Sequence, residues 1–108
     1  MLYEYRVYEA MPGKLPALHA RFRDHTLELF ERHSIKNIGY WTAVAGDYSN
    51  RLIYIVAFED AAQRERAWAS FAQDPDWQRA RAESEVDGPL TARVFNSFLN
   101  PTDYSPLK

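Results

Sequence analysis

The segment RLIYIVAFE, residues 51–59, limits the fold more than any other stretch because it predicts a β-strand with two apolar faces. Its alternating side chains are Leu52, Tyr54, Val56 and Phe58 on one face, and Ile53, Ile55 and Ala57 on the other. Such a strand is typical of a sheet that is covered on both sides. A chain of 108 residues is long enough for one hydrophobic core and too short for two, so we expect a single domain over residues 1–108.

Three further strands are predicted by alternating patterns. They lie at residues 3–9 (YEYRVYE), residues 35–46 and residues 90–99, and the turn GDYSN joins the second to the apolar strand. The first strand carries Tyr3, Tyr5 and Val7 on one face, and Leu2, Glu4, Arg6 and Tyr8 on the other. The second set is too aromatic for open solvent and too charged for an ordinary core.

Helical patterns fill the two intervals between these strands. The first runs from about residue 15 to residue 33, with one apolar side and one charged side. The apolar side holds Leu15, Leu18, Phe22, Thr26, Leu29, Phe30 and His33, and the charged side holds Arg21, Asp24, Glu28 and Glu31. Asp60 and Gln63 resemble a capping box that begins a second helix. Asp74 and Pro75 are a natural N-cap and first residue for a further short helix.

The order of these elements is β-α-β-β-α-β, the split βαβ motif of the ferredoxin-like α+β class. It predicts a four-stranded antiparallel sheet with its helices on one face and with the first and third strands at the centre. The other face would then be a large apolar patch, which soluble monomers rarely expose. We expect a second copy of the chain to cover it, in a homodimer or a higher homo-oligomer. The pattern leaves open which face of the first strand meets the helices.

The charged face of the first strand is a candidate for that contact between copies. Glu4 and Arg6 are two residues apart on the same face, so they can pair with each other or across a two-fold axis, which compensates buried charge. Tyr8 shares this face and completes the set of interface candidates.

Composition excludes several classes of protein and partner. The chain has no cysteine, a net charge of −2 and no stripe of basic residues, so disulfides, thiolate metal sites and nucleic-acid partners are not expected. The longest strongly apolar run, residues 52–58, is far shorter than the ~20 residues of a membrane helix. Charged residues near the N-terminus interrupt any signal-peptide core, so we expect a cytoplasmic location.

Several short motifs, taken in order, resemble the NIPSNAP family. They are MPGKL after the first strand, HSIKNIGYW at residues 33–41, RERAWASF at residues 64–71, DPDW at residues 74–77 and NPTDYSP at residues 100–106. The resemblance covers nearly the whole chain and implies a dimeric α+β barrel, in which two sheets pack face to face. Ser34 departs from the family pattern, which commonly has glycine after the histidine. The family's biochemical activity is undefined, so no residue role follows from the resemblance.

Candidate ligand-binding residues are aromatic or basic side chains that a pocket between helix and sheet would gather. They are Tyr5, Arg6, His25, Tyr40, Trp41, Tyr54, Arg64 and Trp68. Arg64 can either snorkel over Trp68 or clamp an anion, and His25 is the only acid/base candidate, although a structural role is the commoner use of such a residue. We expect His33 to interact with the carbonyls at the end of its helix.

Two functional hypotheses remain open. The first is a non-enzymatic homodimeric module that binds a small organic ligand or a protein. The second is a cofactor-independent monooxygenase or isomerase of the dimeric α+β barrel type, using His25 with pocket tyrosines and an arginine. No metal site is expected, since the three histidines are separated by six and eight residues and not by the three or four of a helical metal site. No cofactor is expected: residues 60–88 lack the histidine that haem-degrading relatives usually need.

Overall fold

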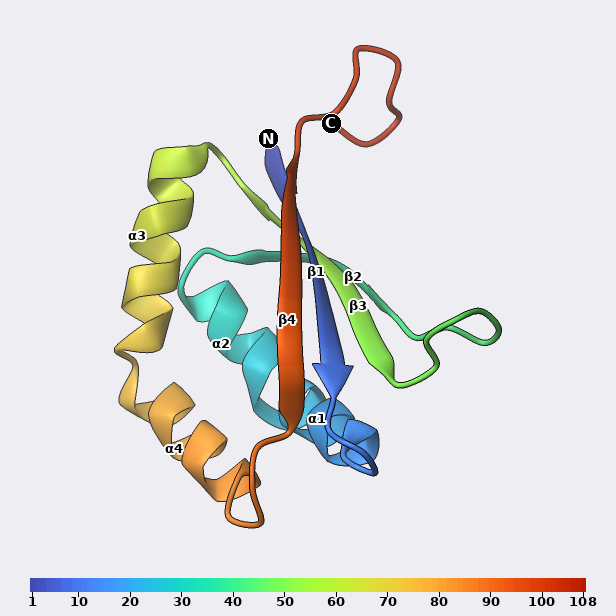
Figure 1. The fold of residues 1–108 in the computed structure, drawn as a ribbon. Coiled ribbons are helices and arrows are strands. Elements are labelled where there is room, and N and C mark those ends of the chain that lie inside the picture. Colours follow the sequence, from blue (N-terminus) through green and yellow to red (C-terminus); the bar gives the residue numbers. More distant parts are fainter.

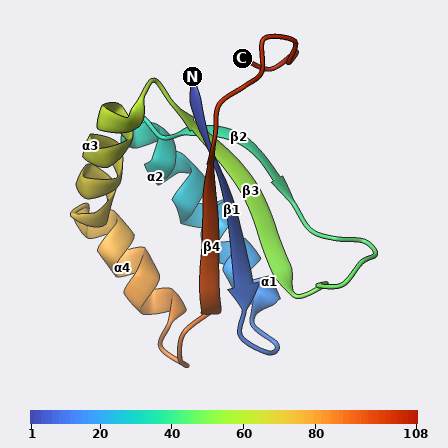
Figure 2. The same ribbon diagram turned by 45° about the horizontal axis from the view of Figure 1, so that its top comes forward.

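The computed structural model describes residues 1–108 and has the predicted β-α-β-β-α-β order (Figure 1). Four antiparallel strands form one sheet in the order β2-β3-β1-β4, which puts the first and third strands at the centre as expected. The strands are β1 (Leu2–Ala10), β2 (Lys36–Trp41), β3 (Arg51–Phe58) and β4 (Thr91–Leu99). The helices lie on one side of this sheet in both views (Figure 1 and Figure 2).

The first helical region is continuous but not uniform. It consists of α1 (Leu15–Arg21), a π-helical turn η1 (Phe22–Thr26) and α2 (Leu27–Arg32). The hydroxyl of Thr26 donates a 3.3 Å hydrogen bond to the carbonyl of Arg21, five residues earlier, inside this wider turn. None of the helices combines the length and the hydropathy needed to cross a bilayer.

The second helical region has the two caps predicted from the sequence. Asp60 accepts a 2.8 Å hydrogen bond from the backbone of Gln63 at the start of α3 (Ala61–Ala72). Asp74 does the same for the backbone of Asp76 at the start of α4 (Pro75–Ser84). In Figure 1, α3 and α4 follow one another along one side of the sheet.

The strand register shows which face of β1 meets the helices. Glu4 lies between Val56 of β3 and Phe98 of β4, and Arg6 lies between Tyr54 and Asn96. The side chains of Glu4 and Arg6 therefore lie beneath the helices, together with the buried Tyr54 and Val56 of β3. The opposite face carries Tyr3, Tyr5 and Val7 and has no helix over it.

An aromatic cluster forms the centre of the core between sheet and helices. Phe22 of η1 packs against Tyr8, Phe30, Tyr40 and Tyr54, with ring centres 5.3 to 6.2 Å apart. Pairs at these distances and tilts stabilise beyond the area that they bury. The helix is thereby fixed against three strands of the sheet.

Two sequence-based expectations about this fold were wrong. Arg21, placed on the exposed side of its helix, is buried, because α4 packs against it and supplies Ser84, Glu85 and the ring of Trp77. The second strand ends at Trp41 and does not reach residue 46, because residues 42–50 form an exposed loop instead of continuing the ladder with β3.

Candidate functional site

A fully buried carboxylate, that of Glu4, organises the polar side chains between β1, β4 and α3. It accepts hydrogen bonds from Arg6 at 2.7 Å, from the Nε of Arg64 at 2.8 Å, and from Trp68 and Asn96 at 3.1 Å each. A second nitrogen of Arg64 lies at 3.3 Å. The oxygens of a carboxylate offer about four lone-pair sites, so these bonds exhaust the accepting capacity of Glu4.

Local helix geometry explains how two of these donors come together. Arg64 and Trp68 are four residues apart on α3, so they lie on the same face of that helix, one turn apart. Both point toward the same carboxylate. Burial alone would raise the pKa of the Glu4 carboxyl, but the hydrogen bonds from Arg64 and Arg6 outweigh it and lower that pKa to about 2. Glu4 is therefore ionised at neutral pH.

The guanidinium of Arg6 links this carboxylate to two tyrosines. Its Nε donates to the hydroxyl of Tyr54 at 2.7 Å, its second terminal nitrogen donates to Tyr8 at 3.3 Å, and its centre lies 4.7 Å from the Trp68 ring. The two hydroxyls lie 3.1 Å apart, with Tyr54 donating to Tyr8. Burial, followed by the neighbouring Tyr8, raises the pKa of Tyr54 well above its usual value. The phenol of Tyr54 is thus neutral at physiological pH.

Most of the unused hydrogen-bonding groups at this cluster are donors, the exception being the amide oxygen of Asn96. Arg6 has five N–H groups and uses three. The hydroxyl hydrogen of Tyr8 has no acceptor in the protein, although its oxygen accepts from both Arg6 and Tyr54. No acceptor of the Glu4 carboxylate is left over to bind these groups.

Beside this cluster, the helices do not cover the β4 side chains that face them. Val94, Asn96 and Phe98 lie opposite Tyr8, Arg6 and Glu4 in the register, and all three are exposed. We call these three residues the β4 shelf. The guanidinium of Arg64 lies over one end of the shelf, 4.6 Å from the centre of the Phe98 ring. The donors and the shelf form one continuous candidate site.

Four of the predicted ligand-binding residues meet at this site: Arg6, Tyr54, Arg64 and Trp68. Tyr40 lies one layer further from the β4 shelf. It stacks on Tyr54 with ring centres 5.0 Å apart, and its own hydroxyl donates to Asn37. Tyr40 therefore contacts the site only through the ring of Tyr54.

The other three predicted residues do not reach the site. Tyr5 alternates with Glu4 and Arg6 along β1 and so faces the helix-free side of the sheet, as does Trp41 of β2. His25 is exposed on η1, in a small hollow of about 190 Å³ between the first helical region and α4. This position separates His25 from every pocket tyrosine, so the acid/base role predicted for it lacks the required geometry.

The predicted placement of Glu4, Arg6 and Tyr8 between two sheets is also wrong. All three face the helices within one copy of the chain, and Glu4 is fully buried there by its contacts with Arg64 and Trp68. The expected pairing of Glu4 with Arg6 is confirmed, at 2.7 Å within one chain.

Asn96 also belongs to the site and was not predicted from the sequence. Its signal was available in the alternation of β4, where Val94, Asn96 and Phe98 share one face and only the middle residue is polar. A polar residue at the centre of such a face indicates a buried or functional partner on the neighbouring strand.

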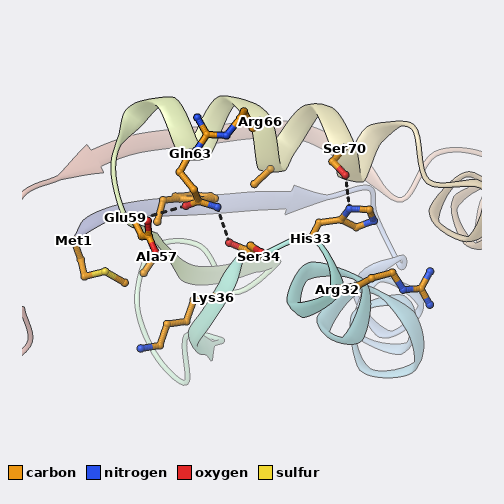
Figure 3. Close-up of a pocket in the computed structure, with 12 residues that line it drawn as sticks. Met1, Arg32, His33, Ser34, Lys36, Ala57, Glu59, Gln63, Arg66 and Ser70 are labelled. Atoms are coloured by element: carbon orange, nitrogen blue, oxygen red, sulfur yellow. Dashed lines mark hydrogen bonds between the residues drawn. The ribbon is translucent and has the colours of Figure 1, made fainter.

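A second hollow lies along another side of α3, next to the start of β2 and the end of β3 (Figure 3). This groove has a volume of about 540 Å³, and its wall includes His33, Ser34, Gln63, Arg66 and Ser70. We call it the α3 groove. The side chain of His33 was expected to bind helix carbonyls, but its two ring nitrogens bind Ser70 and Asp74 instead.

Comparison with known proteins gives consistent results at the level of sequence. The NIPSNAP family model matches residues 3–106. Protein NipSnap homolog 3B of Mus musculus is 33% identical over 76 residues, which are 70% of this chain and 30% of that protein. The chain thus spans less than a third of this curated relative.

Solved structures extend the likeness over the whole fold. A NIPSNAP family protein of unknown function from Agrobacterium tumefaciens is 28% identical with a TM-score of 0.87, covering 100% of this chain and 94% of that one. An uncharacterized NIPSNAP domain protein from Burkholderia xenovorans is 26% identical with a TM-score of 0.84, covering 98% and 99%. A putative antibiotic biosynthesis monooxygenase from Nitrosomonas europaea, 12% identical with a TM-score of 0.64, covers 94% and 98% and shares the fold alone.

Proposed function

The chain belongs to the NIPSNAP family, and from that premise we propose that it forms a homodimer through the helix-free face of its sheet and binds a small organic anion at the β4 shelf. No activity can be assigned to this chain from the family, since the solved members named above are described as uncharacterized or of unknown function. The proposal therefore depends on the chemistry of the two surfaces.

The dimer is supported by the helix-free face, which we call the open face. It presents apolar side chains that are half-buried or exposed: Tyr5, Trp41, Ile53, Ile55, Phe95 and Leu99. The molecule is only 19 Å thick in its shortest direction, which corresponds to one sheet and one layer of helices, each layer spacing being about 10 Å. A second sheet packed on the open face would bury this patch, including Ile53 and Ile55 on the second apolar face of β3.

The charge of the candidate site supports an anionic ligand. Two guanidinium groups, of Arg6 and Arg64, surround the single buried carboxylate of Glu4. Arg64 also contacts Glu65, but that carboxylate is 75% exposed, so solvent screens it. The site retains an excess of positive charge that a ligand carboxylate or phenolate would compensate.

The unused donors support the same conclusion and add specificity. Two N–H groups of Arg6 and the hydroxyl hydrogen of Tyr8 have no acceptor within the protein. A ligand that offers acceptor oxygens can bond to all three, whereas a ligand that offers only donors can bond to none of them. The excess of unused donors over unused acceptors is the observation that carries the proposal.

The body of the ligand is expected to be flat and apolar. Phe98 and Val94 of the β4 shelf and the neighbouring Trp68 ring offer apolar surface beside the donors. Aromatic side chains with a few convergent polar groups are typical of small-molecule sites. We favour a small ligand over a protein partner because Arg6 is recessed, with only 15% of its side chain exposed.

The binding experiment compares benzoate, salicylate and naphthoate with their uncharged amides, using chemical-shift changes of the purified protein. We expect the carboxylates to bind and the amides to bind at least about tenfold more weakly, since each lost charged hydrogen bond costs about 1.5–3 kcal/mol. Tyr8→Phe should weaken carboxylate binding about tenfold. Tyr5→Phe, the matched control on the open face, should leave it unchanged. Equal binding of acids and amides, or equal effects of the two variants, would exclude this site.

The dimer is tested separately by sedimentation. Ile55→Glu places a charge in the middle of the open face and should yield monomers, whereas Ala69→Glu on the exposed side of α3 should leave the dimer intact. A monomeric unmodified protein at micromolar concentration would refute the proposed assembly.

No observation favours the monooxygenase or isomerase hypothesis at present, because His25 does not join the tyrosines and arginines that it was expected to serve. A cytoplasmic location likewise stays a prediction from the sequence.

A further inference from the structure

Three side chains beside the α3 groove form a hydrogen-bonded chain that the ligand site does not use. The Oγ of Ser70 lies 2.6 Å from Nδ1 of His33, and Nε2 of the same ring lies 2.6 Å from Oδ2 of Asp74 (Figure 3 shows the first of these bonds). Ser70 projects from α3 and His33 follows the end of α2, so the contact joins the two helical regions.

The bonding partners determine the roles of the two imidazole nitrogens. Asp74 accepts from His33, from the backbone of Asp76 and from Arg32. The hydrogen bond from His33, followed by that from Asp76, lowers the pKa of Asp74 to about 2, so this group stays an ionised acceptor. Neutral His33 therefore carries its proton on Nε2, toward Asp74, and presents the lone pair of Nδ1 to the Ser70 hydroxyl.

Exposure increases along the chain from the acid to the alcohol. The side chain of Asp74 is 7% exposed and that of His33 13%, whereas Ser70 is exposed at the surface of the α3 groove. A nucleophile has to be accessible, and the base and the group that orients it have to be shielded from water. The order of burial here meets both requirements.

The groove next to Ser70 is large enough for a small substrate, since ligand pockets typically measure about 300–1,000 Å³. Arg66 lines the same groove and precedes Ser70 by one helical turn on α3. It forms no ion pair with a carboxylate of the protein, and its guanidinium lies beside Gln63 (Figure 3), so it adds positive charge to the wall of the groove. The only carboxylate in the wall, Glu59, lies toward the other end of the groove (Figure 3).

We propose that Ser70 is an activated nucleophile, with His33 as its general base and Asp74 as the residue that positions the imidazole, and that the α3 groove hydrolyses small carboxylic esters. In acylation, the Ser70 oxygen bonds to the ester carbonyl carbon while its proton passes to Nδ1 of His33. The bond from that carbon to the alcohol oxygen then breaks, and the alcohol leaves with the proton held by His33. In deacylation, water attacks the acyl-serine by the same route and releases the acid, so ester and water give acid and alcohol without any co-reactant.

The test uses the full chain and a fluorophosphonate probe, which modifies activated serines covalently, with the adduct located by peptide mass spectrometry. We expect Ser70 to be labelled at least about 100-fold faster than Ser34, because general-base assistance contributes about 10²–10⁴-fold. Ser34 is the matched internal control, since it lines the same groove but has no histidine partner.

Turnover is measured with p-nitrophenyl acetate. Ser70→Ala, which removes one exposed hydroxyl, should fold normally and abolish both labelling and the burst of p-nitrophenol. Asp74→Asn should retain the groove but shift the pH dependence of labelling, which a purely structural contact would not do. Labelling of Ser70 no faster than that of Ser34, or ester hydrolysis that persists in Ser70→Ala, would overturn the proposal.

Discussion

The indole Nε1 of Trp68 donates a 3.1 Å hydrogen bond to Oε1 of Glu4, and so joins a helix to a strand residue that precedes it by 64 positions. The same carboxylate is fully buried and accepts from two arginines as well. A charged face on the first strand is therefore part of the interior of this fold. Its charges are compensated within one chain.

Removal of the buried carboxylate should be strongly destabilising. Glu4→Ala leaves Arg6 and Arg64 without their shared partner, and loss of one member of a buried ion pair costs roughly 3–5 kcal/mol. Urea unfolding followed by far-UV circular dichroism measures this cost. Glu28→Ala on the exposed side of α2 is the control, with an expected change within about 0.5 kcal/mol. Similar values for both variants would contradict the buried network.

Stability should depend on pH through the same residue. The pKa of Glu4 is about 2 in the folded chain and 4.5 without the fold, so the stability it contributes is complete above pH 4.5. It is lost as the pH falls from 4.5 toward 2, since protonation then favours the unfolded chain. Glu4→Gln should flatten the stability profile in this window. Part of the slope should remain, because the pKa of Asp74 is lowered as well. An unchanged slope in Glu4→Gln would contradict the assignment.

Phe22 is expected to be one of the costliest positions in the core. Its ring meets four other aromatic rings and is 4% exposed, so Phe22→Ala should lower the free energy of unfolding by roughly 3–5 kcal/mol. The exposed Phe95 on the open face is the comparison, and in the monomeric Ile55→Glu background Phe95→Ala should cost about 1 kcal/mol or less. Thermal unfolding of both variants provides the measurement.

Ser34 has a backbone conformation that favours glycine. Its φ is +63°, in the left-handed region, between the end of α2 and the start of β2. Ser34→Gly should therefore stabilise the chain by about 0.5–1 kcal/mol. Ser49→Gly, in the exposed loop before β3, should give no gain. A loss of stability in Ser34→Gly would show that the serine side chain contributes a contact that outweighs the strain.

Gly39 leaves room for the indole of Trp41 on the open face. A Cβ atom at this position would lie 2.5 Å from the nearest ring carbon. Gly39→Ala should displace this exposed ring at a cost below about 1 kcal/mol, because the end of a side chain can move. If Trp41 belongs to the dimer contact, the same variant should weaken association in sedimentation. An unchanged dissociation constant would exclude Trp41 from that contact.

The sequence predicted the strand order, the helix caps and most of the core, because these depend on local periodicity and on short-range capping chemistry. Asp60 and Asp74 illustrate this, since each cap needs only a backbone N–H two or three residues ahead. Residue type and position on an inner face also predicted that Arg6, Tyr54, Arg64 and Trp68 lie close together, while ligand binding by them stays a proposal.

Predictions that failed depended on contacts between distant elements. Alternation divides β1 into two faces but does not say which one meets a helix, and the answer depends on Arg64 and Trp68 far along the chain. His25 was placed at the edge of an apolar helix face by assuming 100° per residue, but it lies within the π-helical turn η1, where that angle does not hold. Burial of Arg21 required knowing that α4 packs against it.

The sheet order has a consequence for how the chain is made. β1 is synthesised first, yet its partners are β3 and β4, and Tyr3 pairs with Leu99. At about 5–20 residues per second, translation delays this last pairing by roughly 5–20 s. During that interval Glu4 and Arg6 remain hydrated on the nascent strand, and charges on an unpaired strand discourage association with other chains. We therefore expect the residues that organise the folded candidate site also to reduce association of the nascent strand with other chains.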